Sequence, residues 1–122
     1  MATVALSGHT FDETVTRDGI VLVDFWASWC APCRQFAPIF ERASDAHADI
    51  VFAKVDTEAE PALSAAANIT AIPTLMAFRD GILVFAQPGA LPAPMLEQLI
   101  QAVRDLDMDD VRSKLDDRQT TS

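Results

Sequence analysis

Hydrophobic residues change their spacing repeatedly along this chain, and the changes predict alternating strands and helices. The segment Ile20–Ala27 is apolar almost without alternation, which is typical of a strand covered on both faces, and Ile50–Asp56 predicts a second central strand. A short apolar segment at Thr3–Leu6 predicts a further strand. Two more strands are predicted at Thr74–Phe78 and Ile82–Ala86, because the Arg-Asp-Gly sequence between them suits a hairpin turn.

Between these strands the apolar spacing becomes helical. A helix is predicted from Ala31 to about Ala48, and Pro38 inside it should remove one backbone hydrogen bond and kink it. The apolar residues that fall on one side of this helix are Phe36, Ile39, Phe40 and Ala43.

Three shorter helices complete the pattern. Thr-x-x-Glu spacing at Thr10–Glu13 and Thr57–Glu60 predicts capping boxes, the first before a short helix and the second before a helix at roughly Ala59–Ala67. Pro92 suits the first turn of a last helix that runs to about Leu106.

The order β-α-β-α-β-α-β-β-α predicts an α/β fold with three layers. Strands that alternate with helices form a parallel portion, and the late hairpin adds an antiparallel edge. We therefore expect a mixed sheet of about five strands, with four helices on its two faces. Residues 1–106 should form one domain, and residues 107–122 an acidic polar extension that is either helical or disordered.

Composition and charge exclude several classes of function. Nine Lys and Arg stand against 18 Asp and Glu, a net charge of −9, which disfavours binding to nucleic acid or to anionic lipid. The uncharged segments Pro61–Phe78 and Gly81–Leu96 contain prolines, and the first also contains several polar residues, so neither predicts a membrane span. The N-terminal residues lack a secretory signal pattern, and we expect a soluble protein.

The two cysteines, Cys30 and Cys33, are the strongest chemical signal. They follow a buried strand and lie in the first turn of a helix, where backbone N–H groups and the helix dipole stabilise a thiolate. Two intervening residues allow the sulfurs to bond, so Cys33 can displace a substrate captured by Cys30. Three alternatives remain: a structural disulfide, a zinc site completed by His9 and His47, or a pair of inert core thiols.

Asp24 is the single charge inside the first long apolar segment. Burial of a carboxylate should raise its pKa and suit it to accept a proton near neutral pH. Because Asp24 lies six residues before Cys30, its side chain can reach beneath the cysteine pair. The alternative is an ion pair with Lys54 on the neighbouring strand, and both can hold, since a nearby ammonium would also tune the acid.

Five short motifs resemble the thioredoxin family in order and spacing, over about Phe11 to Val103. They are Val23-Asp24-Phe25-Trp26-Ala27-Ser28-Trp29-Cys30-Ala31-Pro32-Cys33 with Ala37-Pro38 after it, Ala53-Lys54-Val55-Asp56, Ile72-Pro73-Thr74, Arg79-Asp80-Gly81, and Gly89-Ala90. The resemblance implies a thioredoxin fold and a protein-disulfide reductase with Cys30 as nucleophile, Cys33 as resolving thiol and Asp24 as proton acceptor, tuned by Lys54.

The resemblance also implies a surface for substrates and a source of electrons. Pro73 should be cis and face the cysteines, and the apolar docking surface beside it should consist of Trp29, Ala31, Pro32, Ala71, Ile72, Gly89 and Ala90. No bound cofactor or metal is expected. Electrons should come from NADPH through a thioredoxin reductase, and the partners should be that reductase and disulfide-containing target proteins, in the cytoplasm, with the chain as a monomer.

Two departures from the family pattern bear on the reduction potential and on the docking surface. Ala31 stands where most members have glycine, and Pro88 where an aliphatic residue is usual. An oxidase or isomerase on the same fold, or a binding subunit whose cysteines are incidental, therefore remain alternatives to the reductase.

Overall fold

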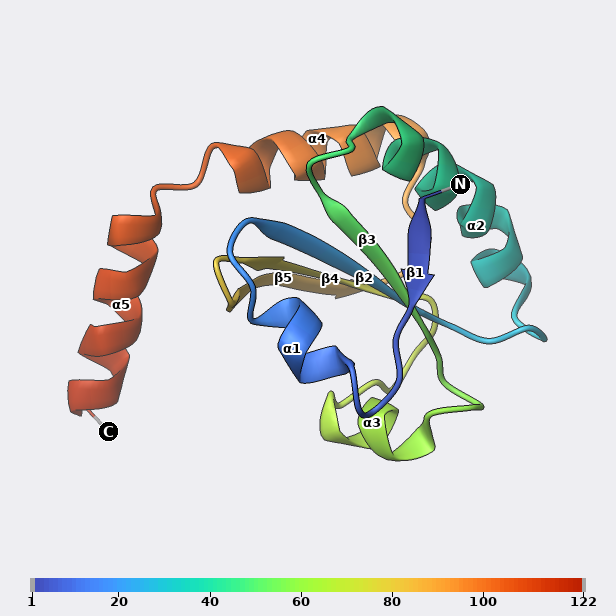
Figure 1. Ribbon diagram of the computed structural model, residues 1–122, viewed down its shortest axis with the longest axis horizontal. Helices are drawn as coiled ribbons and strands as arrows, with labels where there is room; N and C mark the ends of the chain where they lie inside the picture. The colour runs from blue at the N-terminus through green and yellow to red at the C-terminus, as the bar shows by residue number, and fades with distance from the viewer. Residues whose placement is uncertain (1, 122) are drawn as a thin grey trace.

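A computed structural model describes residues 2–121 and contains one five-stranded sheet in the order β1-β3-β2-β4-β5 (Figure 1). β1 and β2 each pair with β3 in parallel, whereas β4 pairs antiparallel with both β2 and β5. This is the mixed sheet that the sequence predicts. The strands are β1 (Thr3–Ala5), β2 (Ile20–Trp26), β3 (Val51–Asp56), β4 (Thr74–Arg79) and β5 (Ile82–Pro88).

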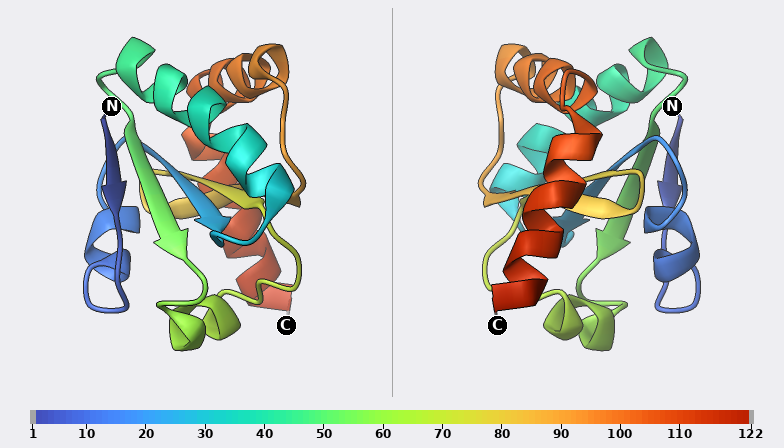
Figure 2. Two further views of the ribbon diagram at one scale, coloured as in Figure 1. Left: turned by 90° about the vertical axis from the view of Figure 1, so that its right-hand side faces the viewer. Right: turned by 90° about the vertical axis from the view of Figure 1, so that its left-hand side faces the viewer.

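Helices cover both faces of the sheet. α2 and α4 lie on one face, and α1 and α3 lie toward the other, so the sheet forms the middle layer (Figure 2). A fifth helix, α5, adds to the four that the sequence pattern predicts. The helices are α1 (Phe11–Val15), α2 (Ala31–Ala46), α3 (Pro61–Ala66), α4 (Ala93–Arg104) and α5 (Met108–Thr121).

β2 separates two hydrophobic cores because its side chains alternate between the faces of the sheet. Leu22 belongs to the core beneath α2 and α4, whereas Val21 and Val23 belong to the core that α1 contacts. The same alternation places Asp24 on the α2 side, with Leu22. Every residue of β2 from Ile20 to Phe25 is buried, which explains why this segment is apolar except for Asp24.

Both predicted capping boxes are wrong. Thr10 does precede α1, but its hydroxyl accepts a hydrogen bond from the Ser7 N–H at 2.9 Å instead of capping the helix. α3 begins only at Pro61, because Thr57 donates from both its N–H and its hydroxyl to the Trp26 carbonyl. In each case a tertiary or turn hydrogen bond occupies the group that the local pattern assigns to the helix end.

The predicted hairpin turn is confirmed between β4 and β5. Asp80 and Gly81 both have positive φ, 52° and 82°, and the Asp80 carboxylate accepts a hydrogen bond from the Gly19 N–H at 2.8 Å. A Cβ atom at Gly81 would approach the carbonyl oxygen of Thr16 to 3.1 Å, so this turn also requires glycine for space.

The chain beyond α4 forms a separate helix. α4 ends at Arg104, and the Asp107 carboxylate accepts hydrogen bonds from the N–H groups of Asp109 and Asp110 at the start of α5. α5 lies beside β5 and the hairpin turn, where Arg112 contacts Asp80 at 3.5 Å (Figures 1 and 2). Among residues 2–121, no helix is long and apolar enough to cross a membrane.

Candidate functional site

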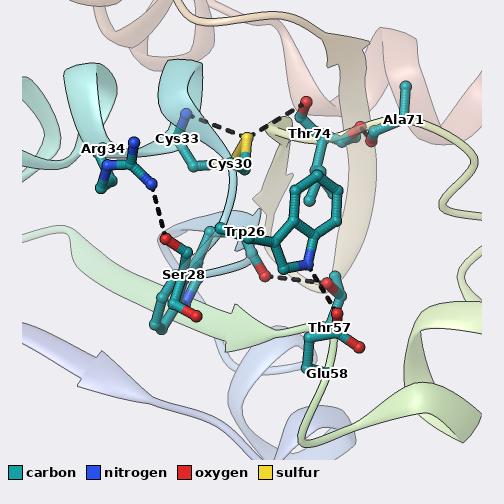
Figure 3. The surroundings of a disulfide bond; sticks show 11 residues. Trp26, Ser28, Cys30, Cys33, Arg34, Thr57, Glu58, Ala71 and Thr74 are labelled. Atoms are coloured by element: carbon teal, nitrogen blue, oxygen red, sulfur yellow. Dashed lines mark hydrogen bonds between the residues drawn. A yellow bond between two sulfur atoms is a disulfide. The ribbon is translucent and has the colours of Figure 1, made fainter.

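A disulfide joins Cys30 and Cys33 at the N-terminus of α2 (Figure 3). Cys30 is the N-cap residue of the helix, and its Sγ accepts a hydrogen bond from the Cys33 N–H at 3.2 Å. Both cysteines are buried, with 4% and 2% of their surface exposed. The helix therefore directs a backbone donor at the sulfur of Cys30, an arrangement that stabilises negative charge on that atom.

The peptide bond between Ile72 and Pro73 is cis, and it lies next to the disulfide. The carbonyl oxygen of Ile72 is 3.8 Å from Cys30 Sγ, and the side chain of Ile72 packs on the cluster that the two cysteines form with Ala27. Pro73 is itself buried, and its carbonyl accepts a hydrogen bond from the Gly89 N–H at 2.8 Å. These contacts bring residues 72, 73 and 89 to one side of the disulfide.

Asp24 is completely buried, and neither carboxylate oxygen has a hydrogen-bond partner among the described residues. Desolvation raises the pKa of Asp24 to about 7, against an ordinary value of 3.8, and the positive charge of Lys54 opposes part of that rise. A carboxyl group with this pKa exchanges protons near neutral pH, which is the property that a proton acceptor requires.

Lys54 lies directly across from Asp24, on β3. Its Nζ atom sits 5.0 Å from the centre of the Trp26 ring, in a cation–π contact. Because the Asp24 oxygens accept no hydrogen bond within the described part of the chain, Lys54 acts on Asp24 through its charge rather than through a direct ion pair.

The residues predicted for the docking surface are mostly exposed. Trp29 leaves 65% of its surface open, and Ile72 is half-buried. Trp29, Ala71 and Ile72 line one shallow hollow, together with Thr57, Ser64, Ile69 and Thr70. Ala31 and Pro32 are exposed in the first turn of α2, and Gly89 and Ala90 are exposed directly after β5.

Two polar side chains near the disulfide carry no motif in the sequence. Glu58 accepts a hydrogen bond from the indole Nε1–H of Trp29 at 2.6 Å, and Arg34 donates to the carbonyl oxygen of Ser28 at 2.8 Å. Figure 3 shows Arg34 with its hydrogen bond to the Ser28 carbonyl, and Glu58 next to Thr57. No local pattern reveals Glu58, because Trp29 and Glu58 are 29 residues apart and meet only in the folded chain.

The histidine positions argue against the zinc alternative. His47 follows the C-terminus of α2, whereas the cysteines lie at its N-terminus, roughly 20 Å away at 1.5 Å of rise per residue. The His47 ring instead contacts Glu97 at 2.8 Å and Arg104 at 3.2 Å. Among the side chains that the structure describes, within residues 2–116, no group of three or more His, Cys, Asp or Glu could hold a metal ion.

A vicinal cysteine pair at a helix N-terminus, beside a cis-proline on an α/β sheet, defines a thiol–disulfide exchange protein. Comparison with known proteins gives the family. The thioredoxin family model matches residues 2–102, and the chain belongs to the thioredoxin family. Members of this family are thiol–disulfide oxidoreductases that work without a bound cofactor. In this chain the pair Cys30 and Cys33 forms the redox centre.

Individual relatives agree with this assignment. The chain is 52% identical to "Putative thioredoxin 2" of Streptomyces coelicolor, over 97% of this chain and 88% of the relative. It is 40% identical to the thioredoxin of Alicyclobacillus acidocaldarius, over 79% and 92%. The crystal structure of Malassezia sympodialis thioredoxin superposes with a TM-score of 0.75 at 30% identity, over 84% and 95%. The fold, the cysteine pair and the relatives together support a protein-disulfide reductase.

Proposed function

We propose that Cys30 is the attacking thiolate of this reductase and that Cys33 is the resolving thiol. The observation that carries the assignment is the hydrogen bond from the Cys33 N–H to Cys30 Sγ, which stabilises negative charge on Cys30 and leaves Cys33 beneath it. Cys30 Sγ also lies 3.8 Å from the carbonyl oxygen of Ile72, a residue that lines the hollow where a target would dock.

The exchange then proceeds in two balanced steps. The Cys30 thiolate attacks one sulfur of a target disulfide, forms a mixed disulfide and releases the other target sulfur as a thiolate, which takes a proton. Cys33 then loses its proton to Asp24 and attacks Cys30 Sγ. The bond to the target breaks, the second target thiol leaves, and two electrons have passed from the cysteine pair to the target.

Asp24 is suited to the second step because it is buried, has no hydrogen-bond partner in the described chain and has a pKa of about 7. A carboxylate with its ordinary pKa would be a weak base toward a thiol, whereas this one retains a proton at neutral pH as readily as it releases it. Burial raises the pKa of Asp24, and the positive charge of Lys54 limits that rise.

Targets dock, in this proposal, on the exposed apolar surface around the disulfide. The backbone of Ile72 offers hydrogen-bonding groups to an extended target segment, and Pro73 holds that backbone against Cys30. The side chains that contact the target are those of Trp29, Ala31, Pro32, Ala71, Ile72 and Ala90, together with the backbone of Gly89.

We also propose an electron donor, an oligomeric state and a cellular compartment for the protein. A flavoprotein thioredoxin reductase returns the electrons from NADPH, and the protein works as a monomer in the cytoplasm. The cysteine count supports a reducing compartment, because both cysteines of the chain belong to the redox pair and none remains for a structural disulfide. Residues 1–106 form the catalytic domain and residues 107–122 an extension, since the family match ends at residue 102.

Trapping the mixed disulfide tests the cysteine assignment. Cys33→Ser should leave Cys30 able to attack but unable to release its target, so covalent complexes with a disulfide-containing protein should accumulate and disappear on adding dithiothreitol. Cys30→Ser is the matched control and should form none. Complexes that accumulate only in the Cys30→Ser variant would reverse the two roles.

A further inference from the structure

A short connector, residues 105–107, separates α4 from α5, and its own sequence does not require a break between the two helices. The connector is Asp105-Leu106-Asp107 and contains neither glycine nor proline. Asp105 has φ −85° and ψ −2°, in the right-handed helical region, whereas many helices end on a residue with positive φ, usually glycine. The backbone of this segment could therefore continue α4 into α5 as one helix.

Arg79, at the end of β4, holds the break from the α4 side. One terminal nitrogen of its guanidinium donates at 2.7 to 3.1 Å to the carbonyls of Val103, Arg104 and Leu106. In a continuous helix these three carbonyls would instead accept the N–H groups of residues 107, 108 and 110. The guanidinium therefore favours an α4 that ends at residue 104.

Asp107 holds the break from the α5 side. Its carboxylate accepts the N–H groups of Asp109 at 3.1 Å and Asp110 at 3.2 Å. A side chain that binds these donors marks the beginning of a new helix, because in a continuous helix they would bond to carbonyls one turn earlier. The chain consequently turns sharply between α4 and α5 (Figure 1).

The contact that seats α5 on the sheet is small and apolar. Its helix residues that are buried or half-buried are Met108, Val111 and Leu115. These are three and four residues apart, so they share one side of the helix. They lie beside the first residues of β5, Ile82–Val84, which we call the docking strip, and a hollow of about 210 Å³ remains there. Leu83 in the strip is 47% exposed, so α5 covers the strip incompletely.

We infer that the docking strip fits α5 of a second copy of this chain, and that Arg79 and Asp107 keep each α5 on its own strip by holding the break. If the connector becomes helical, α5 follows the axis of α4 away from its own β5. It then seats on the strip of the second copy, which returns its own α5 by two-fold symmetry.

The partner follows from the contact itself. The helix that the docking strip accepts in this structure is α5, and an exchange between two copies reproduces the same side-chain contacts. Only the connector differs between the monomer and such a swapped dimer, so the contacts of Arg79 and Asp107 decide which form is favoured. In the unchanged protein these contacts are made, and the chain stays a monomer.

Sedimentation velocity of the full-length protein over a series of concentrations measures the dissociation constant of the dimer. Dithiothreitol in the buffer prevents disulfides between copies. Arg79→Ala removes the hydrogen bonds that end α4 and should lower the dissociation constant about tenfold or more. Arg42→Ala removes the same charge from an exposed position on α2 and should leave the constant unchanged.

Asp107→Ala tests the inference at an exposed position and decides it if Arg79→Ala does not fold. It removes the cap of α5, and alanine favours a continuous helix, so the dissociation constant should fall about fivefold. Asp109→Ala is its matched control, because it removes the same charge two residues further on and leaves the Asp107 carboxylate in place. It should leave the constant unchanged.

A second substitution on α5 tests the docking strip. Val111→Asp places a charge on the side of α5 that contacts the strip, so Arg79→Ala combined with Val111→Asp should return to a monomer. Arg79→Ala combined with Ser113→Asp, on the exposed side of α5, should remain a dimer.

Each part of the inference has a result that overturns it. If Arg79→Ala and Asp107→Ala dimerise no more than their controls, these residues do not hold the break. If they dimerise and Val111→Asp leaves the dimer intact, the copies associate through another surface and the docking strip is wrong.

Discussion

The two ends of the central sheet hold their charged groups in opposite ways. Near the redox end, Asp24 is buried on β2 without a hydrogen-bond partner in the described chain. At the other end of the neighbouring strand, the guanidinium of Arg79 donates to three carbonyls at the C-terminus of α4 and just beyond it, those of Val103, Arg104 and Leu106, at 2.7 to 3.1 Å.

Arg79 and Asp24 differ in their hydrogen bonding because they have different effects on the stability of the protein. Arg79 satisfies carbonyls that the end of a helix leaves without partners, and its positive charge lies at the favourable end of the helix dipole. It therefore stabilises the fold. Asp24 has the opposite effect, because its charged form is desolvated and unpaired. A group that costs stability where an apolar residue would fit is a candidate for a role in the reaction.

Replacing Asp24 should produce the largest change in stability. Its pKa is raised from 3.8 to about 7, so the folded protein binds a proton over this range that the unfolded chain has released, and the free energy of unfolding falls as pH rises. The fall is about 1.4 kcal/mol per pH unit, or about 4 kcal/mol in total. Asp24→Asn removes this loss, so the variant should exceed the unchanged protein by about 4 kcal/mol at pH 8 and match it below pH 4.

Urea denaturation at several pH values measures this difference. Asp18→Asn, at an exposed position, is the control and should show the same pH dependence as the unchanged protein. If Asp24→Asn retains that dependence too, Asp24 titrates in the folded protein as it does in the unfolded chain, and the contrast between the two ends disappears.

Replacing Arg79 should have the opposite sign and a smaller size. Arg79→Ala removes three hydrogen bonds from a charged donor and should lower the free energy of unfolding by about 2–3 kcal/mol. The rate of disulfide reduction should not change, because Arg79 lies at the end of β4 remote from the cysteines. Arg79→Lys should recover part of the stability. An alanine variant of unchanged stability would mean that water replaces the guanidinium at no cost.

Removing the extension should have the smallest effect. α5 buries Met108 and half-buries Val111 and Leu115 beside β5, so deletion of residues 107–122 should lower the free energy of unfolding by less than about 2 kcal/mol. The truncated chain should reduce disulfides at the rate of the full chain. Loss of that activity would show that the boundary proposed at residue 106 divides a functional unit.

Much of the fold could be predicted from the sequence, because burial on both faces leaves β2 apolar except for Asp24. The start of α3 and the capping contacts of α1 could not be predicted. Thr10 and Thr57 match a capping pattern, but the Thr10 hydroxyl accepts a hydrogen bond from the Ser7 N–H in a local turn. The Thr57 hydroxyl donates to the carbonyl of Trp26, which only the folded chain brings near. The sequence did not decide between helix and disorder for residues 107–122, since α5 is polar over most of its length and packs through a few scattered apolar side chains.

The residues of the candidate site likewise fall into two groups, those that the sequence predicts and those that it does not. Cys30, Cys33 and Asp24 stand out because thiols at a helix start and a carboxylate in an apolar strand are unusual in any context. Glu58 and Arg34 do not, since charged residues on exposed segments are common and only their hydrogen bonds to Trp29 and Ser28 give them significance. The importance of these two side chains depends on the groups that they contact, and those contacts are known only from the structure.

The central claim is that Asp24 stays buried and unpaired because it takes the proton of Cys33. The most direct test is the rate at which the reduced protein reduces a protein disulfide, measured from pH 5 to pH 9 for the unchanged protein and for Asp24→Asn. We predict that the variant is slower by about tenfold or more near neutral pH and lacks the rise in rate around pH 7. Superimposable pH profiles would contradict the claim and leave Asp24 with an effect on stability alone.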